Sequence, residues 1–139
     1  MKSKYTPLVK LKKKALDQSE SALIKANTHA TESEAALERA YEELSLLTFP
    51  THGSIGEFTQ SQMILQAQHR EIELGRLRLE QALAHQNKMR DAFQAARVEY
   101  EKFNYLELQE AKAHMAKIKK EEAKMLDEIG TMTYKKEFQ

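Results

Sequence analysis

Histidines are the residues best suited to acid–base or metal chemistry near neutral pH. The chain has five of them, at His29, His52, His69, His85 and His114. No two stand four residues apart and no H-E-x-x-H sequence occurs, so a single helix does not present a histidine pair to zinc. We therefore predict no metal site, and we expect these side chains at the surface or at the edge of a helix interface.

Other sequence patterns that carry chemistry are also missing. There is no Cys, no P-loop and no G-x-G-x-x-G, and the four glycines are too few for a phosphate-binding loop. The 21 Asp and Glu residues would need a cleft that shifts their pKa before they served as catalytic acids or bases. Because the helical pattern described next offers no cleft, we expect a protein that is not an enzyme, with no catalytic residue and no cofactor.

A seven-residue repeat runs through the second half of the chain, from Ser54 to about Met132. One position of the repeat holds Phe58, Leu65, Ile72, Leu79, Gln86, Phe93 and Tyr100. The position three residues later holds Ser61, Gln68, Gly75, Ala82, Met89, Ala96 and Phe103. Such a repeat is typical of a coiled coil, and it predicts one helix roughly 110 Å long that packs against a partner helix.

The first half of the chain supplies that partner. Thr6 is a suitable N-cap and Pro7 a suitable first helical residue. From there the seven-residue positions hold Val9, Leu16, Leu23, Ala30, Leu37 and Leu44, and those three residues later hold Lys12, Ser19, Ala26, Ser33, Ala40 and Leu47. Large side chains at one position and mostly small ones at the other allow two backbones to approach closely.

A short connection separates the two helices and predicts how they pair. Pro50 and Gly53 stop the first helix, and Ser54 with Glu57 fits the capping box that begins the second. Helices joined this way are antiparallel neighbours. We predict an all-α fold, an antiparallel two-helix coiled-coil hairpin whose longer second helix overhangs at the C-terminus. The predicted boundaries within a single domain, 1–139, are a first helix over about 6–47, a turn over 48–54, a second helix over about 55–132 and a loose C-terminal tail.

The unequal helices predict an unpartnered segment. If Leu47 lies opposite Phe58, then Val9 pairs near Ala96, and the second helix has no partner from about Tyr100 onward. The apolar repeat also slips by one residue there, which turns it to another face. It continues as Leu108, Ala111, Met115, Ile118, Glu122, Met125, Ile129 and Met132. An exposed apolar stripe of this length predicts a binding surface. We expect Gly130 to fray the last turn.

Composition narrows the function classes further. The net charge is only +1, which gives no general attraction to nucleic acid. No apolar run approaches the roughly 20 residues that span a bilayer, and the start of the chain has no apolar signal core. We expect a cytoplasmic protein that meets a membrane only through its partners.

Two local features each allow two interpretations. The lysines at the start of the chain, Lys10 to Lys14, either grip an acidic surface or form a solvated helix face whose stems shield the interface. The aromatic residues near the turn, Tyr41, Phe49 and Phe58, either close the end of the helix interface or form an apolar tip that docks on a partner. Aromatic residues do not alternate with the lysines, which argues against RNA binding.

The chain resembles the FliJ family, the small coiled-coil proteins of the bacterial flagellar type III export apparatus. It looks closest to the branch of the campylobacter and helicobacter group. The resemblance lies in KYTPLVKLKKK at residues 4–14, ALIKA at 22–26, VEYEK at 98–102, YLE at 105–107 and KEEAKMLDEI at 120–129. It covers both ends of the chain and, through the unequal hairpin, the whole architecture.

The resemblance implies a function. Proteins of this family are similar to the central stalk of rotary ATP synthases, associate with the hexameric export ATPase and promote its assembly and activity. They also contact the cytoplasmic domain of the membrane export gate and help to recycle export chaperones. By resemblance, this protein is expected at the inner face of the cell membrane at the flagellar base, as a peripheral ATPase regulator in flagellum biogenesis and motility.

The resemblance also implies two sets of partner-binding residues. For the export gate these are Phe58, Leu65, His69 and Arg70, with Leu37, Tyr41 and Leu44 facing them. The match departs from the family pattern at Gln62, where an aliphatic residue is expected. For the ATPase or another partner the residues are Val9, Lys12, Lys13, Leu108, Met115, Ile118 and Met125.

Three other functions remain open from the sequence. A generic coiled-coil adaptor or holdase chaperone would grip clients with the exposed stripe and would not stimulate an ATPase. A nucleic-acid-binding helical protein would show steep salt dependence. A homodimer would join two overhangs as a purely structural element.

Overall fold

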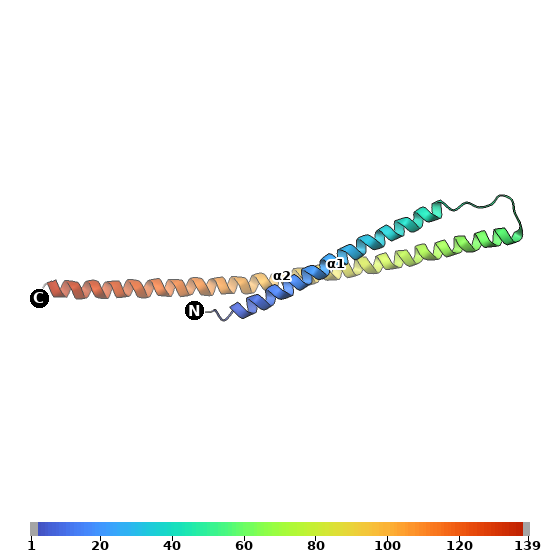
Figure 1. Ribbon diagram of the computed structural model, residues 1–139. Helices are drawn as coiled ribbons and strands as arrows, with labels where there is room; N and C mark the ends of the chain where they lie inside the picture. The colour runs from blue at the N-terminus through green and yellow to red at the C-terminus, as the bar shows by residue number, and fades with distance from the viewer. Residues whose placement is uncertain (1–2, 138–139) are drawn as a thin grey trace. The chain divides into compact units, whose positions relative to one another are not determined.

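The computed structural model describes residues 3–137 and consists of two helices, α1 (Thr6–Ser45) and α2 (Ile55–Glu137), joined by residues 46–54. The helices run antiparallel, which confirms the predicted all-α hairpin with a longer second helix (Figure 1). Contacts divide the described residues into two compact parts, one of residues 17–95 and one in which residues 3–16 accompany 96–137. The prediction that residues 1–139 form a single domain stays a prediction.

The interface within residues 17–95 is built mainly from small side chains. Its buried residues are Ala26, Ala30, Ala40, Ile72 and Ala82. All five stand at the predicted seven-residue positions, which confirms the predicted interface. The side chain of Leu37 lies over Gly75, where a Cβ atom would come 3.2 Å from Leu37 Cδ1. Alanine and glycine let the backbones approach, and Leu37 fills the space opposite Gly75.

Hydrogen bonds between the helices fix their register. Gln86 Nε2 donates to Asn27 Oδ1 at 2.7 Å, and Gln68 Nε2 donates to the Ala40 carbonyl at 2.7 Å. The prediction that Leu47 lies opposite Phe58 is therefore wrong, by about one heptad. A shift of seven residues keeps the same two sets of repeat positions facing each other, so the repeat by itself does not distinguish the two registers.

The connection between the helices explains how the shifted register is reached. α1 ends at Ser45, two residues before the predicted end, and residues 46–54 contain no helix. An extended chain of nine residues reaches much further than a tight turn, so α2 begins beyond the end of α1. The predicted cap is present, because the Glu57 N–H donates to Ser54 Oγ at 3.2 Å.

In the other part of the chain, residues 3–16 lie beside the middle of α2. Lys12 Nζ is 3.5 Å from Glu99 Oε2, and Ser3 Oγ donates to Glu110 Oε2 at 2.7 Å. Leu16 is buried, with 9% of its surface exposed. The prediction that α2 is unpartnered from Tyr100 is therefore wrong, because the first residues of the chain accompany it to about Met115.

The last part of α2 is longer than predicted. The helix passes through Gly130 and continues to Glu137, although the sequence predicted an end near Met132 and a loose tail. A single glycine at an exposed helix position costs only about 1 kcal/mol, and a Cβ atom at Gly130 would meet nothing within 4 Å. Residues 138–139 of the predicted tail lie outside the described residues.

Candidate partner-binding surfaces

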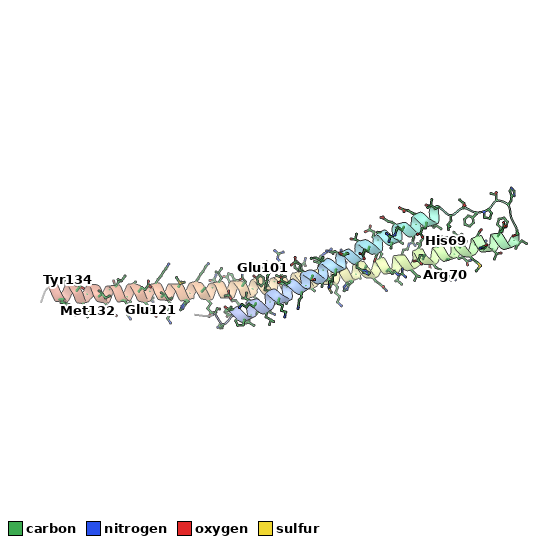
Figure 2. All side chains as sticks on the ribbon, in the orientation of Figure 1. His69, Arg70, Glu101, Glu121, Met132 and Tyr134 are labelled. Carbon is green, nitrogen blue, oxygen red and sulfur yellow. The ribbon has the colours of Figure 1, made fainter. Side chains whose placement is uncertain are left out.

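The side chains with chemical potential are spread along the helices. Among residues 3–136, no three His, Asp or Glu side chains come together as a metal-binding group. His69 and Arg70 lie on the exposed surface of α2, on consecutive positions of one turn (Figure 2). The residues predicted to bind partners lie along both helices.

The residues predicted to bind the export gate occupy two kinds of position. Leu37, Leu44 and Leu65 are half-buried between the two helices. Phe58 is exposed over 42% of its surface, and His69 and Arg70 are exposed as well. The three leucines hold the hairpin together, so the accessible members of this set are the aromatic residue and the His69–Arg70 pair.

The register also separates the two halves of that predicted set. Tyr41 packs against Arg76, whose Nε donates to the tyrosine hydroxyl at 2.7 Å and whose guanidinium lies 5.6 Å from the ring centre. Leu37 lies over Gly75. Leu37 and Tyr41 therefore contact α2 at Gly75 and Arg76, which follow Phe58, Leu65 and the His69–Arg70 pair along the helix, as the one-heptad change of register requires. That these residues bind the gate stays a prediction.

The lysines of the predicted ATPase-binding set are engaged with α2. Lys12 Nζ lies 5.6 Å from the ring centre of Phe103 as well as beside Glu99, and Lys13 Nζ lies 5.5 Å from the ring centre of Tyr100. Cations over aromatic faces contribute modest attraction at exposed sites. These contacts favour the interpretation in which the lysine stems shield the helix interface. Val9, the apolar residue that the same predicted set takes from α1, is half-buried in that interface.

The apolar members of that set lie on an exposed face of α2. The exposed fraction of the residue is 52% for Leu108, 53% for Met115 and 60% for Met125. Ile118 is half-buried. The same face continues with Leu126, Ile129 and Met132, all exposed by more than half. We call Met115, Ile118, Met125, Ile129 and Met132 the distal stripe.

Three residues beside the start of α1 were given no partner-binding role by the sequence analysis. Glu107, Glu110 and His114 line a groove of about 430 Å³ together with Ser3, Thr6, Ala111 and Met115. Glu107 and Glu110 continue the seven-residue spacing of Tyr100 and Phe103, and that spacing was the signal available in the sequence. The polar residues take over the position facing α1, which turns Leu108 and Met115 outward.

Within residues 3–137, neither helix contains a stretch with the length and hydropathy of a membrane span. The fold is a two-helix hairpin, and a long exposed apolar helix face is the kind of surface that binds other proteins. The family model of the flagellar FliJ protein matches residues 1–138, and the chain belongs to the FliJ family. It is thus a component of the flagellar protein export apparatus. No curated protein and no solved structure matches the chain. The particular branch of the family stays a prediction.

Proposed function

We propose that this protein is the central stalk of the hexameric flagellar export ATPase. The observation that carries the proposal is the distal stripe, which begins where residues 3–16 stop accompanying α2 and continues past them, in a chain that belongs to the FliJ family. A helix that continues past its partner can enter a ring of subunits while the paired region stays outside. Hydrolysis would belong to the ATPase, and the stalk would act by binding one state of the ring more tightly than another.

The proposal extends to the membrane side of the apparatus. We assign the exposed Phe58, His69 and Arg70 near the connection to the cytoplasmic domain of the export gate, which would place the protein peripherally at the inner face of the cell membrane. Export chaperones are the third class of partner. These assignments are supported by the exposure of the three side chains and by family membership.

Ring assembly provides a direct test. The purified protein is mixed with the export ATPase of the same cell and a nonhydrolysable nucleotide, and the fraction of hexamer is measured by light scattering after gel filtration. We expect the hexamer fraction to rise and the protein to elute with the ring at less than one chain per ATPase subunit. Met125→Asp should weaken both effects, whereas Asp127→Asn on the outward face should not. Unchanged assembly with no co-elution would favour the adaptor or holdase function instead.

A further inference from the structure

The distal stripe is bordered by charges of opposite sign on its two sides. On the seven-residue spacing of the stripe, Glu121 and Glu128 flank one side, and Lys112 and Lys119 flank the other. All four are exposed, and none of them forms an ion pair among the described residues. Figure 2 shows Glu121 and Met132 on the stretch of α2 that no other helix accompanies.

A further acidic residue interrupts the stripe itself. Glu122 occupies a position where the repeat otherwise places Met115 or Ile129, and it is exposed. A carboxylate in the middle of an apolar interface is unfavourable unless a basic group meets it. The stripe therefore requires an occupant that brings a positive charge to this point.

A second copy of the chain does not meet that requirement. In a parallel pair of stripes, Glu122 would face the same residue of the other copy. In an antiparallel pair, the flank carrying Glu121 and Glu128 would face itself, and so would the flank carrying Lys112 and Lys119. Each arrangement places like charges together, which is destabilising.

A membrane surface also fits poorly. An amphipathic helix that lies on an anionic bilayer carries basic residues beside its apolar face. Here Glu122 would enter the interface, and Glu121 and Glu128 would border it. Acidic residues at these places oppose both the burial of the apolar face and the attraction to anionic lipid.

We propose that the distal stripe binds an amphipathic helix of a different protein, with basic residues along one border of its apolar face, acidic residues along the other, and a Lys or Arg within the face opposite Glu122. This inference deepens the proposed function and rests on it only in that the bound helix would belong to the export apparatus. The charge preference itself follows from the stripe and its flanks.

Three synthetic peptides of about four heptads with one common Leu/Ile face test the preference. The mixed peptide has a lysine border, a glutamate border and a central lysine within the apolar face. The second peptide has lysine at all border and central positions, and the third has glutamate there. Binding to the full-length protein is measured by fluorescence anisotropy at low salt. We expect the mixed peptide to bind about ten-fold more tightly than either of the others.

Charge variants of the protein sharpen the test. Changing Lys112→Glu and Lys119→Glu makes both flanks acidic, so this variant should prefer the all-lysine peptide by about ten-fold. The control is Lys117→Glu with Lys120→Glu, which changes the net charge equally on the outward face and should leave the wild-type preference intact. Circular dichroism checks that both variants remain helical.

Three results would overturn the inference: equal affinity of the wild-type protein for all three peptides, self-association that Met125→Asp abolishes, or tighter binding to anionic vesicles than to the mixed peptide. Failure of peptide binding together with intact ATPase assembly would refute the charge preference alone. Peptide binding with the expected charge preference, together with loss of the effect on ATPase assembly, would refute the stalk function alone.

Discussion

Leu37 and Gly75 are in direct contact across the hairpin, with Leu37 Cβ 3.9 Å from the position that a Cβ atom would occupy at Gly75. Two facing cysteines form an unstrained disulfide when their Cβ atoms are about 3.5–4.5 Å apart. The protein contains no cysteine of its own, so engineered pairs can be tested without interference.

The register predicts which cysteine pair becomes oxidised. Leu37→Cys with Gly75→Cys should form an intramolecular disulfide under mild oxidation, seen as a shift on a non-reducing gel. Leu47→Cys with Phe58→Cys tests the register that the sequence alone favoured and should stay reduced. Efficient closure of the second pair with failure of the first would show that the helices pair one heptad away from the register described above.

Glycine substitutions should separate helix propensity from packing. Gly75→Leu places a bulky side chain against Leu37 and should lower the free energy of unfolding by about 1–3 kcal/mol. Gly130→Ala meets no neighbouring atom and should raise it by about 0.5–1 kcal/mol, because alanine is the better helix former. Urea unfolding followed by circular dichroism measures both. A stabilising Gly75→Leu would contradict the close approach of the two helices there.

The interface and the distal stripe should respond differently to a buried charge. Leu16→Asp places a carboxylate at a buried position and should lower Tm by about 10 °C or more. Met125→Asp, at a residue that is 60% exposed, should change Tm by no more than about 2 °C, since surface substitutions have small effects. Equal destabilisation by both changes would mean that the stripe is packed in the free protein.

Glu110 should hold the first turn of α1 in place. That turn has no acidic residue of its own, and Glu110 supplies a negative charge beside it by accepting a hydrogen bond from Ser3. Negative charge near a helix N-terminus is favourable. Glu110→Ala should therefore raise deuterium uptake over residues 3–9 about three-fold. Glu122→Ala, which removes a carboxylate away from α1, serves as the control, and equal uptake in both variants would contradict this role.

Along most of both helices, the repeat predicted which residues of each helix lie in the interface. Ala26, Ala40 and Ala82 are buried as the spacing required, and the Ser54 cap forms as its sequence indicated. The register was beyond the reach of the repeat, because neighbouring heptads are alike in size pattern. The connection between the helices determines the register. The seven-residue repeat says nothing about the distance that a non-helical connection spans.

The same limit explains the outcome for the candidate sites. Leu37 and Tyr41 lie further along α2 than the sequence predicted, because the pairing differs by one heptad. The exposure of Met115 and Met125 was predictable, because the unequal lengths of the helices already indicated that α2 extends past α1. Glu107 and Glu110 were overlooked because a search for apolar residues passes over a polar continuation of the same seven-residue spacing.

Phosphate release by the export ATPase tests the stalk function most directly. The purified protein is titrated into the ATPase of the same cell at fixed ATP. We predict stimulation that saturates well below one chain per ATPase subunit and that Met125→Asp reduces. A rate that stays constant across the titration, with the wild-type protein folded, would contradict the proposal that this helical hairpin acts as the stalk of the ring.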